Sequence, residues 1–235
     1  MFFCAKYIRK YREIVQMEKT EAIVDTCFLE KLSAGGKKTD NIKAILEELD
    51  FKPVAHPYIC EHELSVNYYS EELLKTGYIK KIEYSEFLKD AYDEQLYENY
   101  FLLLHEDMRS YLEAKGGIKQ IEKLRIHPGH TIYDTHYQGS SMGDVHMILM
   151  AAFMRLPVIL TEDSDIALLS TLANKRLSLG TYNLVIYDAW DLVKQIAERP
   201  DSKVSKKDLI QILNDMGERD KRSEMKTIWN NNHDS

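Results

Sequence analysis

Cysteine is scarce in this chain of 235 residues, which contains only Cys4, Cys27 and Cys60 and no CxxC pair. An odd, sparse set of this kind is neither a disulfide framework nor a zinc site, and it fits a reducing compartment. Glycine and proline are also few, at ten and five residues, which excludes a collagenous or low-complexity chain. Because no window approaches ~18 uninterrupted apolar residues, we expect no membrane span.

The first residues, MFFCAKYIRKYREIVQ, lack the continuous apolar stretch that a signal peptide needs. Lys6, Arg9, Lys10 and Arg12 interrupt that stretch, and residues 2–17 are predicted to form an additional helix. We therefore expect a cytoplasmic protein that does not associate with a membrane.

Hydrophobic residues make up 44% of the chain and charged residues 29%, which suits one packed core and excludes a disordered chain. Lysine and arginine number 31 against 38 acidic residues, so the net charge is −7. An acidic chain is not a general nucleic-acid binder. A nuclease can nevertheless be acidic overall, because its metal site concentrates carboxylates.

Apolar runs alternate with amphipathic segments, a pattern that predicts an α/β fold with a mainly parallel sheet. Strands are predicted within 21–29, at 53–59, and at the start of 157–169 and of 182–200. Helices are predicted at 40–49, 61–77, 85–115, 118–126, 142–156 and 205–215. We expect one domain over 1–235, with a core at about 20–195, a helical insert at about 75–125 and a charged C-terminal tail from about 201.

Acidic residues lie beside the apolar strands at several points along the chain. They are Asp25, Glu61, Glu63, Asp144, Asp163 and Asp165. In an open parallel sheet, ligands bind outside the carboxyl ends of the strands, so these acids can converge on one edge. Gathered carboxylates repel one another unless cations neutralise them, and Mg²⁺ or Mn²⁺ is the expected partner of an oxygen-only site.

Each acid also has a purely structural explanation. Asp25 would cap the turn after its strand, and Asp163 and Asp165 would cap the helix that begins near Ile166. The sequence Ser-Met-Gly-Asp that ends at Asp144 matches a capping box before an apolar run. For a single residue the structural and functional explanations weigh equally, and only the joint pattern favours a metal site.

That joint pattern resembles the PIN-domain family of metal-dependent ribonucleases. The matching stretches are IVDTCFL, PYICEHEL, SMGDVHMILMAAFMRLPVILTEDSDIALL and, more weakly, YNLVIYDAWDL. The resemblance covers residues 20–195 apart from the insert, and it implies a three-layer α/β/α fold with additional terminal helices. The catalytic metal ligands that it implies are Asp25, Glu63, Asp144 and Asp163. Asp165 resembles a frequent additional acid.

The resemblance leaves the second acid open between Glu61 and Glu63. A Glu-Leu pair after the strand favours Glu63, which precedes Leu64. Two residues on a helix are separated by roughly 200° of rotation, so only one of the two carboxylates can face the site. Thr161 resembles the hydroxyl residue before the acidic cluster, and it would hydrogen-bond a metal ligand.

The resemblance implies a divalent-metal-dependent endoribonuclease that cleaves single-stranded RNA through a metal-activated water, leaving a 5′-phosphate and a 3′-hydroxyl. Its role would be that of a toxin in a toxin–antitoxin pair, with an inhibitory protein partner, or of an RNA-processing enzyme; a homo-oligomer is also expected. The alternatives are a non-catalytic PIN-like module that binds nucleic acid or protein, and another Mg-dependent phosphoryl-transfer enzyme. A haloacid-dehalogenase-type phosphatase needs DxD after its first strand, where this chain has Cys27.

The histidines show no firm metal-ligand spacing, and His146 is predicted to be a core residue. The helical insert is expected to stand beside the site as a lid or substrate platform. Lys119 and Lys123 would share a helix face there, and Lys115 and Arg125 would also meet phosphates.

Overall fold

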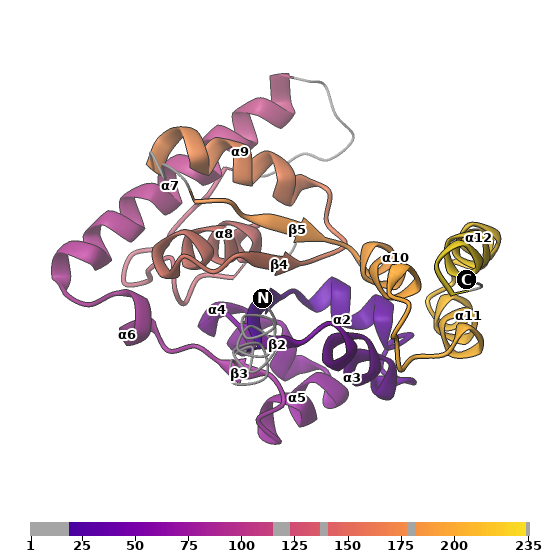
Figure 1. The fold of residues 1–235 in the computed structure, drawn as a ribbon. Coiled ribbons are helices and arrows are strands. Elements are labelled where there is room, and N and C mark those ends of the chain that lie inside the picture. Colours follow the sequence, from indigo (N-terminus) through magenta and orange to yellow (C-terminus); the bar gives the residue numbers. More distant parts are fainter. Residues whose placement is uncertain (1–18, 115–122, 137–140, 178–181, 234–235) are drawn as a thin grey trace, which may run out of the picture.

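The computed structural model describes residues 19–114, 123–136, 141–177 and 182–233. Within them, five parallel strands form one sheet that lies between two layers of helices (Figure 1). The prediction of a three-layer α/β/α fold with a parallel sheet is therefore confirmed. The helix predicted at 2–17 lies outside the described residues.

The sheet has the strand order β3-β2-β1-β4-β5. The strands are β1 (Thr20–Val24), β2 (Phe51–Ala55), β3 (Lys80–Lys81), β4 (Val158–Leu160) and β5 (Val185–Tyr187). From β1 the chain builds outward to β3, and then crosses back to place β4 on the other side of β1. The strand order reverses at β1 and β4, and such a switch point opens a crevice at the carboxyl ends of the strands.

The two layers of helices cover opposite faces of the sheet (Figure 1), and within each layer the main helices contact one another. One layer contains α2 (Thr26–Leu32), α3 (Thr39–Glu48) and α10 (Ala189–Glu198), and the other contains α7 (Ala91–Ala114), α8 (Met142–Met154) and α9 (Asp165–Leu177). The remaining helices are α4 (Pro57–His62), η1 (Leu64–Val66), α5 (Tyr68–Lys75), α6 (Tyr84–Phe87), α11 (Lys206–Asp215), η2 (Arg219–Lys221) and α12 (Arg222–His233).

The core is formed by the segments with the longest apolar runs. In the central strand β1, the three residues before Asp25 are fully buried, because helices cover both faces of the sheet. Helix α8 is apolar on almost every side, and apart from Asp144 it is buried from Met142 to Ala152 by β4, α4, α7 and α9. These two segments fix the positions of the acids that follow β1 and begin α8.

The strand predicted at 53–59 is shorter than expected. β2 ends at Ala55, and α4 begins at Pro57, where a proline fits the first turn because no backbone N–H is needed there. The Nδ1 atom of His56 caps this helix by accepting from the Tyr58 backbone N–H at 3.0 Å. The helix predicted at 61–77 is accordingly divided into the end of α4, η1 and α5.

The insert predicted at about 75–125 is not entirely helical, because it contains the edge strand β3. Its long helix α7 belongs to one of the helical layers. The 24 residues of α7 bury Tyr97, Phe101, Leu104 and Met108, which share one face and pack toward α8 and α9. Most of the helix predicted at 118–126 lies outside the described residues, and the part after it, up to 136, contains turns and no strand.

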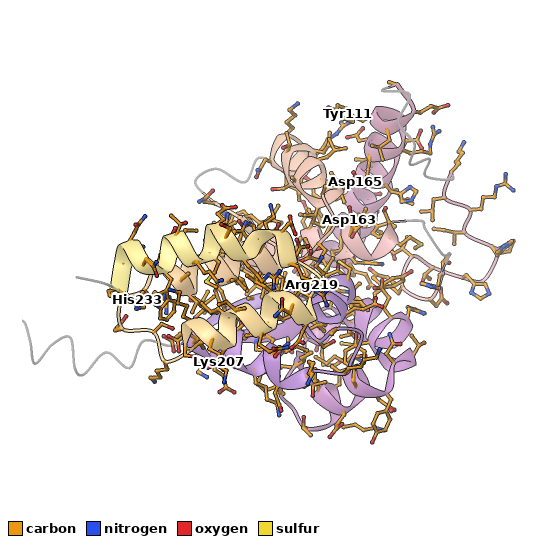
Figure 2. All side chains as sticks on the ribbon, turned by 90° about the vertical axis from the view of Figure 1, so that its right-hand side faces the viewer. Tyr111, Asp163, Asp165, Lys207, Arg219 and His233 are labelled. Carbon is orange, nitrogen blue, oxygen red and sulfur yellow. The ribbon has the colours of Figure 1, made fainter. Side chains whose placement is uncertain are left out.

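The chain beyond 201 is not only a charged tail. Helices α11 and α12 pack on the outer side of α10, and Figure 2 shows this pair from outside with Lys207, Arg219 and His233 labelled. The final asparagines belong to α12, where the rings of Trp229 and His233 stack with centroids 3.6 Å apart. Among the described helices, none has the length and apolar character required to cross a bilayer.

Candidate functional site

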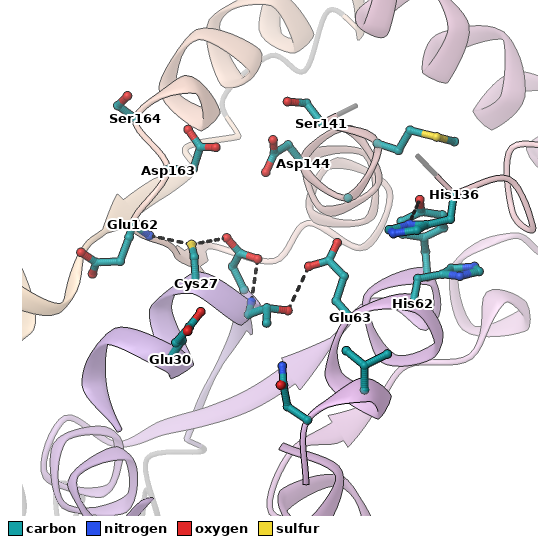
Figure 3. Close-up of a pocket in the computed structure, with 17 residues that line it drawn as sticks. Cys27, Glu30, His62, Glu63, His136, Ser141, Asp144, Glu162, Asp163 and Ser164 are labelled. Atoms are coloured by element: carbon teal, nitrogen blue, oxygen red, sulfur yellow. Dashed lines mark hydrogen bonds between the residues drawn. The ribbon is translucent and has the colours of Figure 1, made fainter. Parts of the chain in front are cut away.

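A pocket of about 660 Å³ opens at the carboxyl edge of the sheet, at the switch point between β1 and β4. Its lining includes four of the acids that were singled out in the sequence, which come from four separate segments: Asp25, Glu63, Asp144 and Asp163. Figure 3 shows Glu63, Asp144 and Asp163 pointing toward the same space. The fold therefore brings together residues that are up to 138 positions apart (163 − 25).

Asp25 follows β1 directly and is buried, with 6% of its surface exposed. One carboxylate oxygen accepts from the Thr26 backbone N–H at 2.6 Å and so caps α2. The other accepts from Cys27 Sγ at 2.6 Å and from Thr161 Oγ1 at 2.7 Å. The predicted capping role is thus present, and the same carboxylate lines the pocket.

Thr161 links the segment of Asp25 to the segment of Asp163 through hydrogen bonds of its hydroxyl group. Its buried hydroxyl donates to Asp25 and accepts from the Asp163 backbone N–H at 3.0 Å. The Cys27 thiol lies 3.4 Å from the same hydroxyl and accepts from the Glu162 backbone N–H at 3.3 Å. Burial and the charge of Asp25 raise the pKa of this thiol, so it acts as a neutral hydrogen-bonding group.

Glu63 reaches the pocket from the end of α4. Its Oε2 accepts from Thr26 Oγ1 at 2.9 Å, which links it to the start of α2. Burial, and then the charge of Asp25, raise the pKa of Glu63 to about 7, against the weaker opposing effect of the Thr26 hydrogen bond. Bringing a second negative charge into this space is therefore unfavourable without a neutralising group.

Gly143 lets the start of α8 lie against the end of α4. A Cβ atom at position 143 would lie 2.6 Å from Glu63 Oε1 and 2.7 Å from Ile59 Cδ1, so any larger residue would displace these two side-chain ends. The Ser141 side chain makes no capping hydrogen bond to α8, so the hydroxyl half of the predicted capping box is not formed.

Asp163 lies in the turn between β4 and α9. One of its oxygens accepts from the Asp165 backbone N–H at 2.8 Å, so the predicted structural role is again present beside the position in the pocket. Asp165 begins α9 and is not among the residues that line the pocket.

Glu61 lies on the other side of α4 from Glu63. Its exposed carboxylate accepts from Lys81 Nζ at 2.9 Å, and it is not among the residues of the pocket. Of the two glutamates that the sequence left open, Glu63 is the one that faces the acids.

Among the Asp, Glu, Lys and Arg residues of the described lining, all are acids. Glu30 and Glu162 add two acids that the sequence analysis did not single out, whereas no lysine or arginine belongs to the described lining. Such a site attracts cations, and its carboxylate oxygens are the donor type that suits Mg²⁺ or Mn²⁺. Among the described residues, however, no three His, Cys, Asp or Glu side chains are close enough to hold one metal ion. The donor set fits a divalent ion in kind, while the interatomic distances do not form a coordination shell.

The side of the pocket beyond Glu63 is aromatic. His62 and His136 line it (Figure 3), together with Tyr58, whose ring centroid lies 4.5 Å from that of His62. Sequence reasoning missed this side because 74 positions separate the two histidines (136 − 62) and no spacing rule connects them.

Of the four basic residues expected to meet phosphates, the two that the structure describes do not line the pocket. Lys123 and Arg125 are exposed and do not line it, and Lys115 and Lys119 lie outside the described residues.

Comparison with protein-family models, curated proteins and solved structures finds no match for this chain. The resemblance to the PIN-domain family therefore stays a prediction from the sequence.

Proposed function

We propose that this chain is a Mg²⁺- or Mn²⁺-dependent endoribonuclease that acts on single-stranded RNA at the acidic pocket. The observation that carries the proposal is the meeting of Asp25, Glu63, Asp144 and Asp163 in one pocket at the switch point of a parallel sheet. The four acids come from four separate segments of the chain and line one pocket, where their like charges repel one another unless a cation neutralises them.

Electrostatics supports a requirement for a cation. The substrate backbone is anionic, and the described lining of the pocket offers it six carboxylates and no lysine or arginine. A phosphate enters such a site only if positive charge neutralises the acids. The raised pKa of Glu63 has the same origin, since a buried carboxylate beside Asp25 resists ionisation.

Asp25, Glu63, Asp144 and Asp163 would hold the ion. When bound, a divalent ion supplies charge neutralisation at the phosphate and a lowered pKa for a nearby water molecule. The hydroxyl groups of Thr161 and Thr26 orient Asp25 and Glu63 by donating to their carboxylates. Gly143 sets the approach of α8 and thereby the position of Asp144.

A non-catalytic module that binds nucleic acid or protein is the second candidate. It is favoured by the absence, among the described residues, of three donor side chains within reach of one ion. It is also favoured by the capping bonds of Asp25 and Asp163, which give both acids a structural role.

A cleavage assay with two matched variants separates these proposals. Glu63→Gln and Glu61→Gln make the same chemical change two residues apart on α4, but only Glu63 lines the pocket. We expect wild type to cleave single-stranded RNA with Mn²⁺ and not with EDTA, Glu63→Gln to lose activity by orders of magnitude, and Glu61→Gln to retain it. Equal activity of both variants, or cleavage in EDTA, would contradict the metal-dependent ribonuclease.

A further inference from the structure

The segment of residues 131–136, whose last residue His136 lines the pocket, contains no helix and no strand. Side chains hold it in place instead. His146 Nε2 lies 3.0 Å from the Ile132 carbonyl, His62 Nε2 lies 3.3 Å from the Tyr133 carbonyl, and Tyr58 Oη donates to the Thr135 carbonyl at 3.1 Å. Side chains of α4 and α8 therefore hold three backbone carbonyls of this segment in place, whereas most surface loops are mobile.

The deepest of these groups belongs to a buried hydrogen-bonded chain. His146 Nδ1 lies 2.8 Å from Tyr97 Oη, and the same hydroxyl lies 3.1 Å from His56 Nε2. Because His56 Nδ1 accepts from the Tyr58 backbone, its Nε2 carries the hydrogen and donates to Tyr97, which in turn donates to His146. His146 Nε2 is then the donor to the Ile132 carbonyl. Each ring nitrogen of His56 and His146 and the Tyr97 hydroxyl thus has a hydrogen-bond partner while both imidazoles are neutral.

The hydrogen bonds that hold this segment also place His136 at the pocket. Its Nδ1 lies 2.9 Å from Tyr58 Oη, and its ring stacks on His62 with centroids 5.2 Å apart and planes within 4°. Since the Tyr58 hydroxyl gives its one hydrogen to Thr135, His136 Nδ1 donates to Tyr58, and the lone pair of Nε2 remains for a ligand. The ring is exposed and lines the pocket.

The two sides of the pocket offer different chemistry. In Figure 3 the labelled residues run from Asp163 through Asp144 and Glu63 to His136 and His62. The acidic side suits an ion and a phosphate, which fill a small part of about 660 Å³. A volume of this size is typical of sites for whole small molecules, so the aromatic side is available to the rest of one nucleotide.

We propose that His136 contacts the nucleobase of the nucleotide whose phosphate faces the acids. The base stacks on the exposed surface of the imidazole, which His62 supports from the other side. Stacking on a π-face is tolerant of sequence, and a base inside a duplex is not available for it. This inference rests on the proposed function, because it assigns the substrate class of the same pocket.

Binding of uridine 5′-monophosphate and of ribose 5-phosphate, measured by NMR titration with Mg²⁺ present, tests the proposal. The two probes share the phosphate and differ by the base. For wild type we expect the nucleotide to bind roughly tenfold more tightly, the lower range of one base stacked on an aromatic group. In His136→Ala the affinity for ribose 5-phosphate should be unchanged, and the preference for the nucleotide should fall to nearly onefold.

Two further variants control this result. His136→Phe keeps an aromatic surface and should keep most of the preference, whereas His127→Ala, at an exposed position that precedes the segment and does not line the pocket, should behave as wild type. Equal binding of both probes by wild type, an unchanged preference in His136→Ala, or its loss in His136→Phe would overturn the proposal. Failure of the ribonuclease itself shows separately, as absent RNA cleavage and ribose 5-phosphate binding that does not depend on Mg²⁺.

Discussion

Replacing Glu63 with glutamine removes a carboxylate whose ionisation the fold opposes. Burial and the charge of Asp25 raise its pKa from 4.5 to about 7. Each tenfold change in proton affinity corresponds to about 1.36 kcal/mol, so the charged form is disfavoured by roughly 3 kcal/mol in the folded protein. Solvent in the open pocket screens part of this penalty, and we therefore expect the charge of Glu63 to lower the free energy of unfolding by about 2 kcal/mol.

The sign follows from which state binds the proton more tightly. The folded chain does so, and therefore the contribution of Glu63 to the free energy of unfolding falls as pH rises from about 4.5 to about 7. Glu63→Gln has no charge to form, and its amide oxygen can still accept from Thr26. At pH 8 without metal the variant should melt on the order of 5 °C above wild type, and at pH 4 the two should melt together.

Thermal melts of both proteins at pH 4, 6 and 8 in EDTA measure this difference directly. Addition of Mn²⁺ at pH 8 should then reverse the order, because wild type gains about 2.7 kcal/mol at a concentration 100 times the dissociation constant and the variant gains less. A gap between the two melting temperatures that does not change with pH would refute the assigned environment of Glu63. Equal gains on adding Mn²⁺ would refute its role as a ligand.

Asp163→Asn should abolish RNA cleavage, measured on single-stranded RNA, while denaturant unfolding shows little loss of stability, because asparagine caps a helix about as well as aspartate. Gly143→Ala should destabilise the fold by roughly 1–3 kcal/mol in the same unfolding assay, since its Cβ would lie 2.6 Å from Glu63 Oε1. Thr161→Val should lower Mn²⁺ affinity roughly 10- to 100-fold by calorimetry, because Asp25 loses a hydrogen-bond donor. A stable but active Asp163→Asn, a stable Gly143→Ala and an unchanged Mn²⁺ affinity are the respective contradicting results.

The parts of the fold that could be predicted are those with strong local signals. The run Ala22–Val24 reads as a buried strand because a central parallel strand is covered on both faces, and the structure places it there. The apolar character of 142–156 predicted a buried helix for the same reason. Asp188, directly before α10, accepts from the Asp191 backbone N–H at 2.7 Å, as an aspartate at a helix start commonly does.

The parts that were missed depend on signals that serve more than one structure. Pro57 suits a strand end and a first helical turn equally, so the boundary between β2 and α4 was placed wrongly. Helix α12 has a charged sequence, yet it packs on the protein through the buried Met225. Asn230, nearer its end, has a low helix propensity, which by itself favours a frayed end. In both cases tertiary packing decides what the local sequence leaves open.

The candidate site divides in the same way. The positions of Asp25, Asp144 and Asp163 followed from strand and helix ends, which a parallel sheet brings to one edge. The side with Tyr58 and His136 follows from a loop whose path is set by hydrogen bonds to distant side chains, and those bonds leave no periodic trace in the sequence.

The most direct test of the metal site is the anomalous difference density of a crystal soaked in Mn²⁺. We predict a peak inside the pocket, with oxygen atoms of at least three of Asp25, Glu63, Asp144 and Asp163 at about 2.0–2.6 Å from the ion. The carboxylate of Glu61 should remain with Lys81, away from the peak. A pocket that stays without Mn²⁺ while the soaked crystal takes up the ion elsewhere would contradict the account.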